Sequence, residues 1–406
     1  MKINPTKTVN ELVVILPYII DVDDNKKIYH SWRVAIICAL SAKNFIGPEQ
    51  LKQLFYAALL HDIGGIGFPI HIIHYLKRRD KTSRNILLSH PIVGAQLISN
   101  IPQMDESARL ILDHHEWLNG MGYPRAKSGK SIPWGSQVIR IADSIDIYLQ
   151  LGGIKKLKIL KDKMASNINK EYSQQLFAIA FEVLAKNRFF NKVSSSATLP
   201  SIFKDVQNMV GMLHINSKND SIGKALEAIA QIIDMKHPFT AGHSLRVSRY
   251  AMSVGLSMGL EHDDITRIRW AGLIHDIGKL NVPRKVLDKS TKLTPGEFRR
   301  IKMHAHSTYE IMNMIETLWD ITPIASGHHE RYDGKGYPFG LKKDEIHLGS
   351  RILAVCDAFD AMTSNRPYRN PLDTAAACKE IKKQSGKQFD PEVVDKALPL
   401  FMNLGF

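Results

Sequence analysis

The stretch His275-Asp276-Ile277-Gly278-Lys279 combines an imidazole, a carboxylate and an ammonium group, which a plain helix end does not require. An imidazole beside a carboxylate can supply a nitrogen and a bridging oxygen to adjacent metal ions, and the lysine behind them can meet a phosphate. Such a pair also occurs by chance as a helix cap or surface pair, so the motif alone decides little. Other imidazoles and carboxylates accompany it, at His243, His304, His328, His329 and Asp357. This set, which contains no thiolate, suits Fe, Mn or Zn and predicts a metal site rather than a Cys-rich structural zinc site.

The first half of the chain repeats this set at a nearly constant spacing. His61 precedes His275 by 275 − 61 = 214 positions, and only the first ligand of the set departs from this offset, by one residue. The repeated residues are His30, His61, Asp62, His90, His114, His115 and Asp143. The neighbours of the histidines match as well, because Gly120, Gly122, Tyr123 and Pro124 correspond to Gly334, Gly336, Tyr337 and Pro338. A duplication of this extent predicts two copies of one domain, each with its own core.

Helical periodicity of apolar residues runs through nearly every segment, with no credible series of alternating strands. The sequence therefore predicts an all-α chain of two tandem bundles, each of five or more helices. We expect a first domain over residues 1–195 and a second over residues 222–406. Serines between Val193 and Pro200, and glycine and asparagine at 216–223, predict a linker over residues 196–221.

The C-terminal copy resembles the HD superfamily of metal-dependent phosphohydrolases and, within it, the HD-GYP cyclic-dinucleotide phosphodiesterases. The matching motifs are His275–Lys279, His328–Pro338, Asp357–Met362, Arg366–Arg369 and Phe389–Pro391. The N-terminal copy resembles the same family in degraded form. The resemblance implies two tandem HD-type helical bundle domains and two divalent metal ions, or three if Asp234 is a further ligand. Histidine-rich and carboxylate ligation favours Fe or Mn as the active ions.

These residues suggest a division of labour within the C-terminal pocket. We expect Asp276 to bridge the ions and, with Lys279, to act in catalysis, while Lys279 also binds a phosphate oxygen of the substrate. Arg366 and Arg369 are candidates for binding the second phosphate or a guanine edge, since a guanidinium donates paired hydrogen bonds. The Gly334–Pro338 loop is expected to shape the pocket or contact a protein partner.

The resemblance implies hydrolysis of a cyclic dinucleotide, 3′,3′-cGAMP or cyclic di-GMP, to linear dinucleotide and mononucleotides in bacterial second-messenger signalling. Two alternatives stay open. One is a nucleotidase or alarmone hydrolase of the same superfamily. The other is a receptor that binds a cyclic dinucleotide without hydrolysing it and signals through a partner.

The N-terminal copy keeps the ligand types but loses charges that would face a substrate. Gly65 stands where the other copy has Lys279, and Gly152 stands in place of Arg366. After Asp143 the likeness fades, and no Phe-Asp-Pro follows. In the loop, Trp117, Asn119 and Met121 replace Arg331, Asp333 and Lys335. We expect this copy to hold metal without turning over substrate and to regulate its neighbour; the alternative is a decaying duplicate that covers an apolar face.

The composition indicates a basic chain without a membrane segment or a disulfide framework. The net charge of +14 favours anionic partners without choosing among nucleotides, nucleic acid and lipid. The apolar run from Leu12 to Ile20 is broken by Pro17 and is too short to span a bilayer. Three scattered cysteines form no disulfide framework, and no signal-peptide pattern is present. We therefore expect a cytoplasmic protein without a membrane segment, and we leave a homodimer open.

Overall fold

The computed structural model describes residues 4–22, 29–66, 81–150, 153–216, 220–236, 241–289, 291–365 and 370–403. The chain divides into two compact units, Asn4–Ser221 and Ile222–Phe406. Both units consist of helices and connecting loops, and β-structure in the described ranges is confined to isolated bridges. The predicted all-α fold is therefore confirmed. No helix within these ranges has the length and apolar character needed to cross a membrane.

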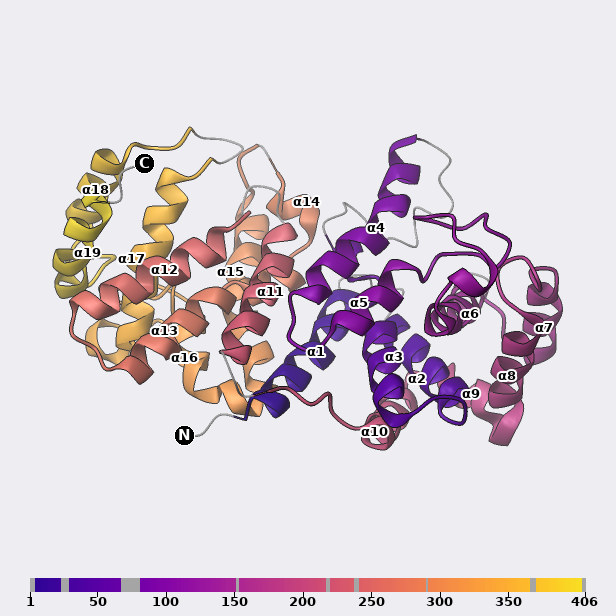
Figure 1. Ribbon diagram of the computed structural model, residues 1–406. Helices are drawn as coiled ribbons and strands as arrows, with labels where there is room; N and C mark the ends of the chain where they lie inside the picture. The colour runs from indigo at the N-terminus through magenta and orange to yellow at the C-terminus, as the bar shows by residue number, and fades with distance from the viewer. Residues whose placement is uncertain are drawn as a thin grey trace. The chain divides into compact units, whose positions relative to one another are not determined.

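The N-terminal unit is arranged around α2 (His30–Ala42), which is buried on nearly every face. Helices α3 (Pro48–Leu60), α6 (Trp134–Gln150) and α8 (Gln174–Ala185) pack against α2 (Figure 1). The other helices of this unit are α1 (Pro5–Val22), α4 (Lys81–Ser99), α5 (Asp105–Leu112), α7 (Leu157–Ala165), α9 (Phe189–Val193) and α10 (Leu199–Val210), with the short 3-10 helices η1 (Ile63–Gly65), η3 (Gly129–Ser131) and η4 (Lys186–Arg188).

The C-terminal unit uses α12 (His243–Ser257) in the same way. Helices α13 (His262–Ile274), α17 (Leu348–Thr363) and α19 (Pro391–Asn403) pack against it. The unit is completed by α11 (Ser221–Met235), α14 (Arg284–Leu287), α15 (Pro295–Asn313), α16 (Thr322–Ser326) and α18 (Thr374–Lys383), with the 3-10 helices η5 (Ile277–Asn281), η6 (Glu316–Ile321) and η7 (Lys343–Glu345).

The duplication extends further in structure than in sequence. Helices α3 and α13 begin and end 214 positions apart, since 262 − 48 and 274 − 60 both equal 214. Helices α7 and α18, and likewise α8 and α19, begin 217 positions apart, since 374 − 157 and 391 − 174 both equal 217. The sequence likeness fades after Asp143, but the helices still correspond, and a shift of three residues hid this correspondence. Buried Tyr172 takes the place of Phe389 in the other copy.

The segment expected to link the domains, residues 196–221, belongs to the N-terminal unit. Its helix α10 packs on α2 and α3, and the ring of Phe203 stacks on Trp32 with centroids 4.2 Å apart. After α10, the chain is held by Asn10, whose side chain exchanges hydrogen bonds of 2.9 and 3.0 Å with the backbone of Leu213. The serine and glycine content of the segment therefore marks turns within a packed structure rather than an independent linker.

Local chemistry at the start of α15 explains how two ligand-bearing elements meet. Thr294 caps the helix, Pro295 occupies its first turn, and the Glu297 carboxylate accepts a 2.8 Å hydrogen bond from the Thr294 N–H. Helix α15 then packs on η5 at Gly278, where an added Cβ would lie only 2.0 Å from the His304 carbonyl oxygen. Glycine at this position therefore lets the backbone after Asp276 approach the turn that carries His304.

Candidate metal centres

The structure brings the predicted C-terminal ligands into one pocket from five separate elements. His243 begins α12, Asp276 follows α13, and His304 lies within α15. His328 and His329 follow α16, and Asp357 lies on α17 with its Oδ1 3.3 Å from Nε2 of His243. The ligand atoms form two groups, and within each group all the atoms lie within 4.8 Å of one another. One group comes from His243, His275 and Asp276, and the other from His304, His328 and His329.

Asp276 lies between these two groups. Its Oδ2 is 3.6 Å from Nε2 of His243 and 3.4 Å from Nε2 of His275. Its Oδ1 is 3.4 Å from Nε2 of His304 and 3.9 Å from Nε2 of His328. Each oxygen thus faces a different pair of imidazoles, which is the arrangement needed for one carboxylate to be shared by two ions.

The hydrogen bonds of the imidazoles orient their free nitrogens toward Asp276. Nδ1 of His275, His304 and His328 lies 2.9, 2.5 and 2.7 Å from the carbonyl oxygen of the residue three positions earlier. Because a carbonyl oxygen only accepts, each Nδ1 carries the proton and each Nε2 keeps its lone pair. This is the tautomer that binds a metal ion through Nε2.

His243 is oriented by a carboxylate that the sequence interpretation did not assign. Asp360 accepts a 2.7 Å hydrogen bond from Nδ1 of His243 and is also bound by Arg246, at 2.5 and 3.0 Å. Burial alone would raise the pKa of Asp360, but the bonds from His243 and Arg246 hold it below its ordinary value. Asp146 binds His30 at 2.7 Å in the other copy. The 214-residue offset between Asp146 and Asp360, each three residues after a predicted ligand, was the signal that could have found them.

The donor set fits divalent cations. Nε2 of His243, Nε2 of His275 and Oδ1 of Asp276 are buried and make no hydrogen bond within the described ranges. Buried polar atoms without partners are costly, and a cation among them would satisfy all three. Burial lowers the pKa of His304 to about 4 and that of His329 to about 3, so both rings are neutral and able to bind metal.

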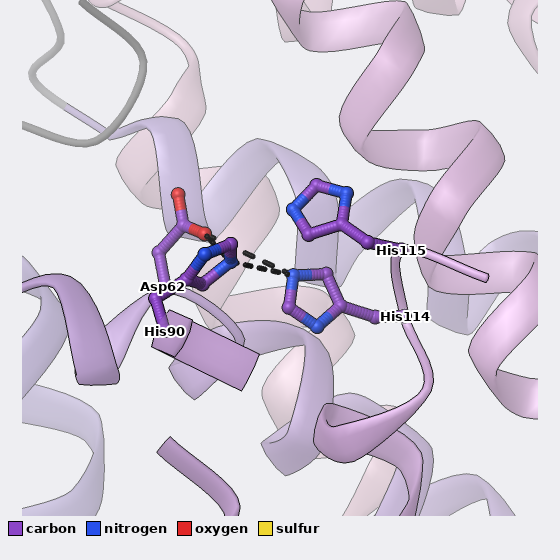
Figure 2. Close-up of side chains that lie close together, drawn as sticks. All are labelled: Asp62, His90, His114 and His115. Atoms are coloured by element: carbon purple, nitrogen blue, oxygen red, sulfur yellow. Dashed lines mark hydrogen bonds and ion pairs between the residues drawn. The ribbon is translucent and has the colours of Figure 1, made fainter. Parts of the chain in front are cut away.

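The N-terminal pocket repeats this geometry. Oδ2 of Asp62 is 3.6 Å from Nε2 of His30 and 3.5 Å from Nε2 of His61, while Oδ1 is 3.4 and 3.9 Å from Nε2 of His90 and His114. Figure 2 shows Asp62, His90 and His114 joined by such contacts, with His115 beside His114. Two groups of candidate ligands again form: Asp62, His90, His114 and His115, and His30, His61 and Asp143.

One charged side chain of the N-terminal pocket is not repeated at the matched sequence position of the other copy. Arg140, on α6, lies 3.2 Å from Nδ1 of His115 and 3.1 Å from Oδ2 of Asp143 through its Nη1. Its Nε and Nη2 donate to Glu171 at 3.1 and 2.6 Å. The matched position in the C-terminal copy is Ala354. The sequence interpretation considered only the charges that this copy lost, and so it missed one that it gained.

The predicted substrate-binding residues are only partly described. Lys279 donates from Nζ to Oδ2 of Asp276, and its side chain is 19% exposed. Arg366 and Arg369 lie outside the described residues. Asp234, the candidate for a third ion, accepts hydrogen bonds from the N–H and hydroxyl of Ser244 at 3.2 and 2.8 Å.

The Gly334–Pro338 loop is anchored beside the histidine pair. Oxygens of the Glu330 carboxylate accept backbone hydrogen bonds from Phe339 at 2.6 Å, and from the next two residues at 3.1 Å each. The Tyr337 ring packs on His329 with centroids 4.8 Å apart. The loop therefore lies against the histidine pair, and its roles in shaping the pocket and in contacting a protein stay predictions.

Comparison with known proteins agrees with the duplicated pattern. The family model of the HD domain matches residues 22–171 and again residues 227–393. The chain belongs to the HD domain family. A 3′3′-cGAMP-specific phosphodiesterase 3 of Vibrio cholerae is 30% identical over 334 residues, which cover 81% of this chain and 71% of that protein. A cyclic di-GMP phosphodiesterase of Thermotoga maritima is 33% identical over 57% of this chain and 64% of its own length.

The fold of this HD domain protein also matches a solved structure. A crystal structure of a cyclic GMP-AMP specific phosphodiesterase of V. cholerae aligns over 98% of both chains, with a TM-score of 0.64 and 23% identity. This likeness supports the all-α fold.

Proposed function

We propose that the C-terminal unit is a metal-dependent phosphodiesterase that hydrolyses a cyclic dinucleotide, 3′,3′-cGAMP or cyclic di-GMP, to the linear dinucleotide and onward to mononucleotides. The observation that carries this proposal is the position of Asp276 between two groups of imidazoles. The substrate class is supported by the relatives, which include enzymes named for each of these dinucleotides.

In this proposal, Fe or Mn ions bound in the pocket would supply an activated water and offset the charge of the phosphodiester. Asp276 would hold the ions as a pair, and His243 and Asp357 would be ligands on one side of the site. Lys279, which rests on Asp276, can turn its ammonium to a non-bridging phosphate oxygen. Arg366 and Arg369 bind the second phosphate or a base edge.

A cysteine nucleophile is disfavoured at this site. Cys356 lies next to Asp357 on α17, but it is buried. Burial, and then the neighbouring Asp357 carboxylate, raise the pKa of its thiol well above the ordinary value. Since the thiolate is the reactive form, Cys356 stays an inert thiol, and water is the better candidate for the attacking group.

The N-terminal unit is proposed to regulate or position its neighbour rather than to turn over substrate. Gly65 offers no cation where the other copy has Lys279. Arg140, a cation that this pocket does contain, is engaged by Glu171 and Asp143. Neither residue therefore supplies a free positive charge to a phosphate.

A substrate panel tests the proposal against both alternatives. The full chain, loaded with Mn or Fe without oxygen, is incubated with 3′,3′-cGAMP, cyclic di-GMP, a guanosine alarmone and mononucleotides. We expect cleavage of a cyclic dinucleotide and its loss in Asp276→Ala. Cleavage of only the alarmone or mononucleotides would indicate a nucleotidase, and tight dinucleotide binding without product would indicate a receptor.

The same assay distinguishes the two pockets. Asp62→Ala, the matched change in the N-terminal copy, should leave cleavage measurable. If Asp276→Ala retains hydrolysis that disappears only when Asp62→Ala is added, the N-terminal pocket is the enzyme and the assignment of roles is wrong.

A further inference from the structure

Arg140 changes the chemistry of one predicted N-terminal ligand, His115. The Nη1 atom of Arg140 lies 3.2 Å from Nδ1 of His115, and both side chains are largely buried. A guanidinium only donates hydrogen bonds, so Nδ1 of His115 must accept. In a neutral imidazole that accepts at Nδ1, the proton is on Nε2. Neither nitrogen of His115 then has a lone pair available for a metal ion.

The other imidazoles of this pocket have the opposite tautomer. Nδ1 of His61, His90 and His114 lies 2.8, 2.8 and 2.6 Å from a backbone carbonyl oxygen, which only accepts. Their Nε2 lone pairs therefore face Asp62. His115 alone among these four is engaged by a cation, while the Tyr123 ring stacks against it with centroids 4.7 Å apart.

The two halves of the N-terminal pocket are consequently unequal. On one side, Asp143 gives Oδ2 to Arg140 but keeps Oδ1 at 3.7 Å from Nε2 of His30 and 3.9 Å from Nε2 of His61. That side retains two imidazoles and two carboxylate oxygens, counting Oδ2 of Asp62. Among the described residues, the other side retains His90, His114 and Oδ1 of Asp62, because Arg140 engages His115.

We propose that the N-terminal copy is a mononuclear metal site, in which one divalent ion is held by His30, His61, Asp62 and Asp143 and Arg140 excludes the second ion by engaging His115. The proposal rests on metal binding by this copy and not on the identity of the dinucleotide. The C-terminal copy offers the internal comparison, because Ala354 stands at the position of Arg140 and Gln388 at that of Glu171.

The test gives the N-terminal pocket the residue types that the C-terminal copy has at the matched positions, Ala354 and Gln388. Arg140→Ala with Glu171→Gln removes the guanidinium and also the carboxylate that would otherwise be left buried without its partner. The full-length chain is reconstituted with Mn, and bound metal per chain is measured by elemental analysis. We expect the double variant to bind one more ion per chain than the wild type. The wild type should also show the electron paramagnetic resonance signal of an isolated Mn(II) ion, which the variant should lose.

Single histidine variants keep the proposal testable if the double variant does not fold. We expect His61→Ala to lose one ion per chain and His115→Ala to lose none, whereas His329→Ala, the C-terminal match of His115, should lose an ion. Loss of an ion in His115→Ala, or an unchanged count in a folded double variant, overturns the proposal. An unchanged count in His61→Ala overturns it as well, and cleavage by the same sample shows separately whether the proposed phosphodiesterase function stands.

Discussion

Asp360 should control metal affinity without being a ligand itself. Its carboxylate receives hydrogen bonds from Nδ1 of His243 and, through both oxygens, from Arg246. In Asp360→Asn the side chain keeps its size but loses its charge and one acceptor, so His243 and Arg246 compete for a single oxygen. Loss of a partner that orients a metal-bound histidine typically costs about 10–100-fold in affinity or activity. Since a tenfold change is about 1.4 kcal/mol, we expect a loss of about 1.4–2.8 kcal/mol in metal binding.

The assay is a titration of the metal-free full chain with Mn in competition with a chelator, followed by hydrolysis at limiting and at saturating Mn. All the metal ligands remain in Asp360→Asn, so excess Mn should restore most of the activity. Excess Mn should not rescue Asp276→Ala, which lacks the shared carboxylate. Asp146→Asn, the matched control, should weaken metal binding by the N-terminal copy and reduce hydrolysis by less than tenfold.

One outcome would refute this reasoning directly. If Asp360→Asn binds Mn as tightly as the wild type while His243→Ala does not, orientation by Asp360 contributes nothing to the site. Thermal unfolding of the same samples separates this result from a general loss of structure, because a folded variant with weak binding regains stability when Mn is added.

Three further outcomes are expected. Lys279→Ala should keep its bound metal but cleave about 10²–10³-fold more slowly, because one preorganised donor is removed. Elemental analysis and turnover of the same sample test this, and a variant that loses its metal but keeps its cleavage rate would contradict it. Removal of metal with a chelator should abolish hydrolysis, and Fe or Mn should restore it; recovery with Mg alone would argue against the His-rich site. Phe203→Ala should lower the free energy of unfolding by about 3–5 kcal/mol in denaturant titrations, because this buried ring joins α10 to α2; a change below about 1 kcal/mol would mean that α10 is only loosely attached.

The sequence by itself determined the fold class, the duplication and the candidate ligands. Each of these features can be recognised from a pattern in the sequence: helical periodicity, a nearly constant offset of 214 positions, and residue types with known metal chemistry. Asp276 lies within 3.6 Å of imidazoles in both groups, and its role as a bridging ligand stays a prediction. Gly65 likewise revealed the loss of a cation, because an absent side chain can be recognised without knowing its surroundings.

Only the tertiary structure decided which groups act on those ligands. Asp360 repeats Asp146 at the 214-residue offset, whereas Arg140 has no such signal in the sequence. The contacts of both residues arise because α17 meets α12 and α6 approaches the turn after α5. The hydrogen bond from Arg140 to His115 joins residues that are distant in the sequence and produces no recognisable sequence pattern. The tautomer of His115 could therefore not be inferred from its spacing. The same holds for α10, whose attachment depends on Phe203 meeting Trp32 across 171 positions, since 203 − 32 = 171.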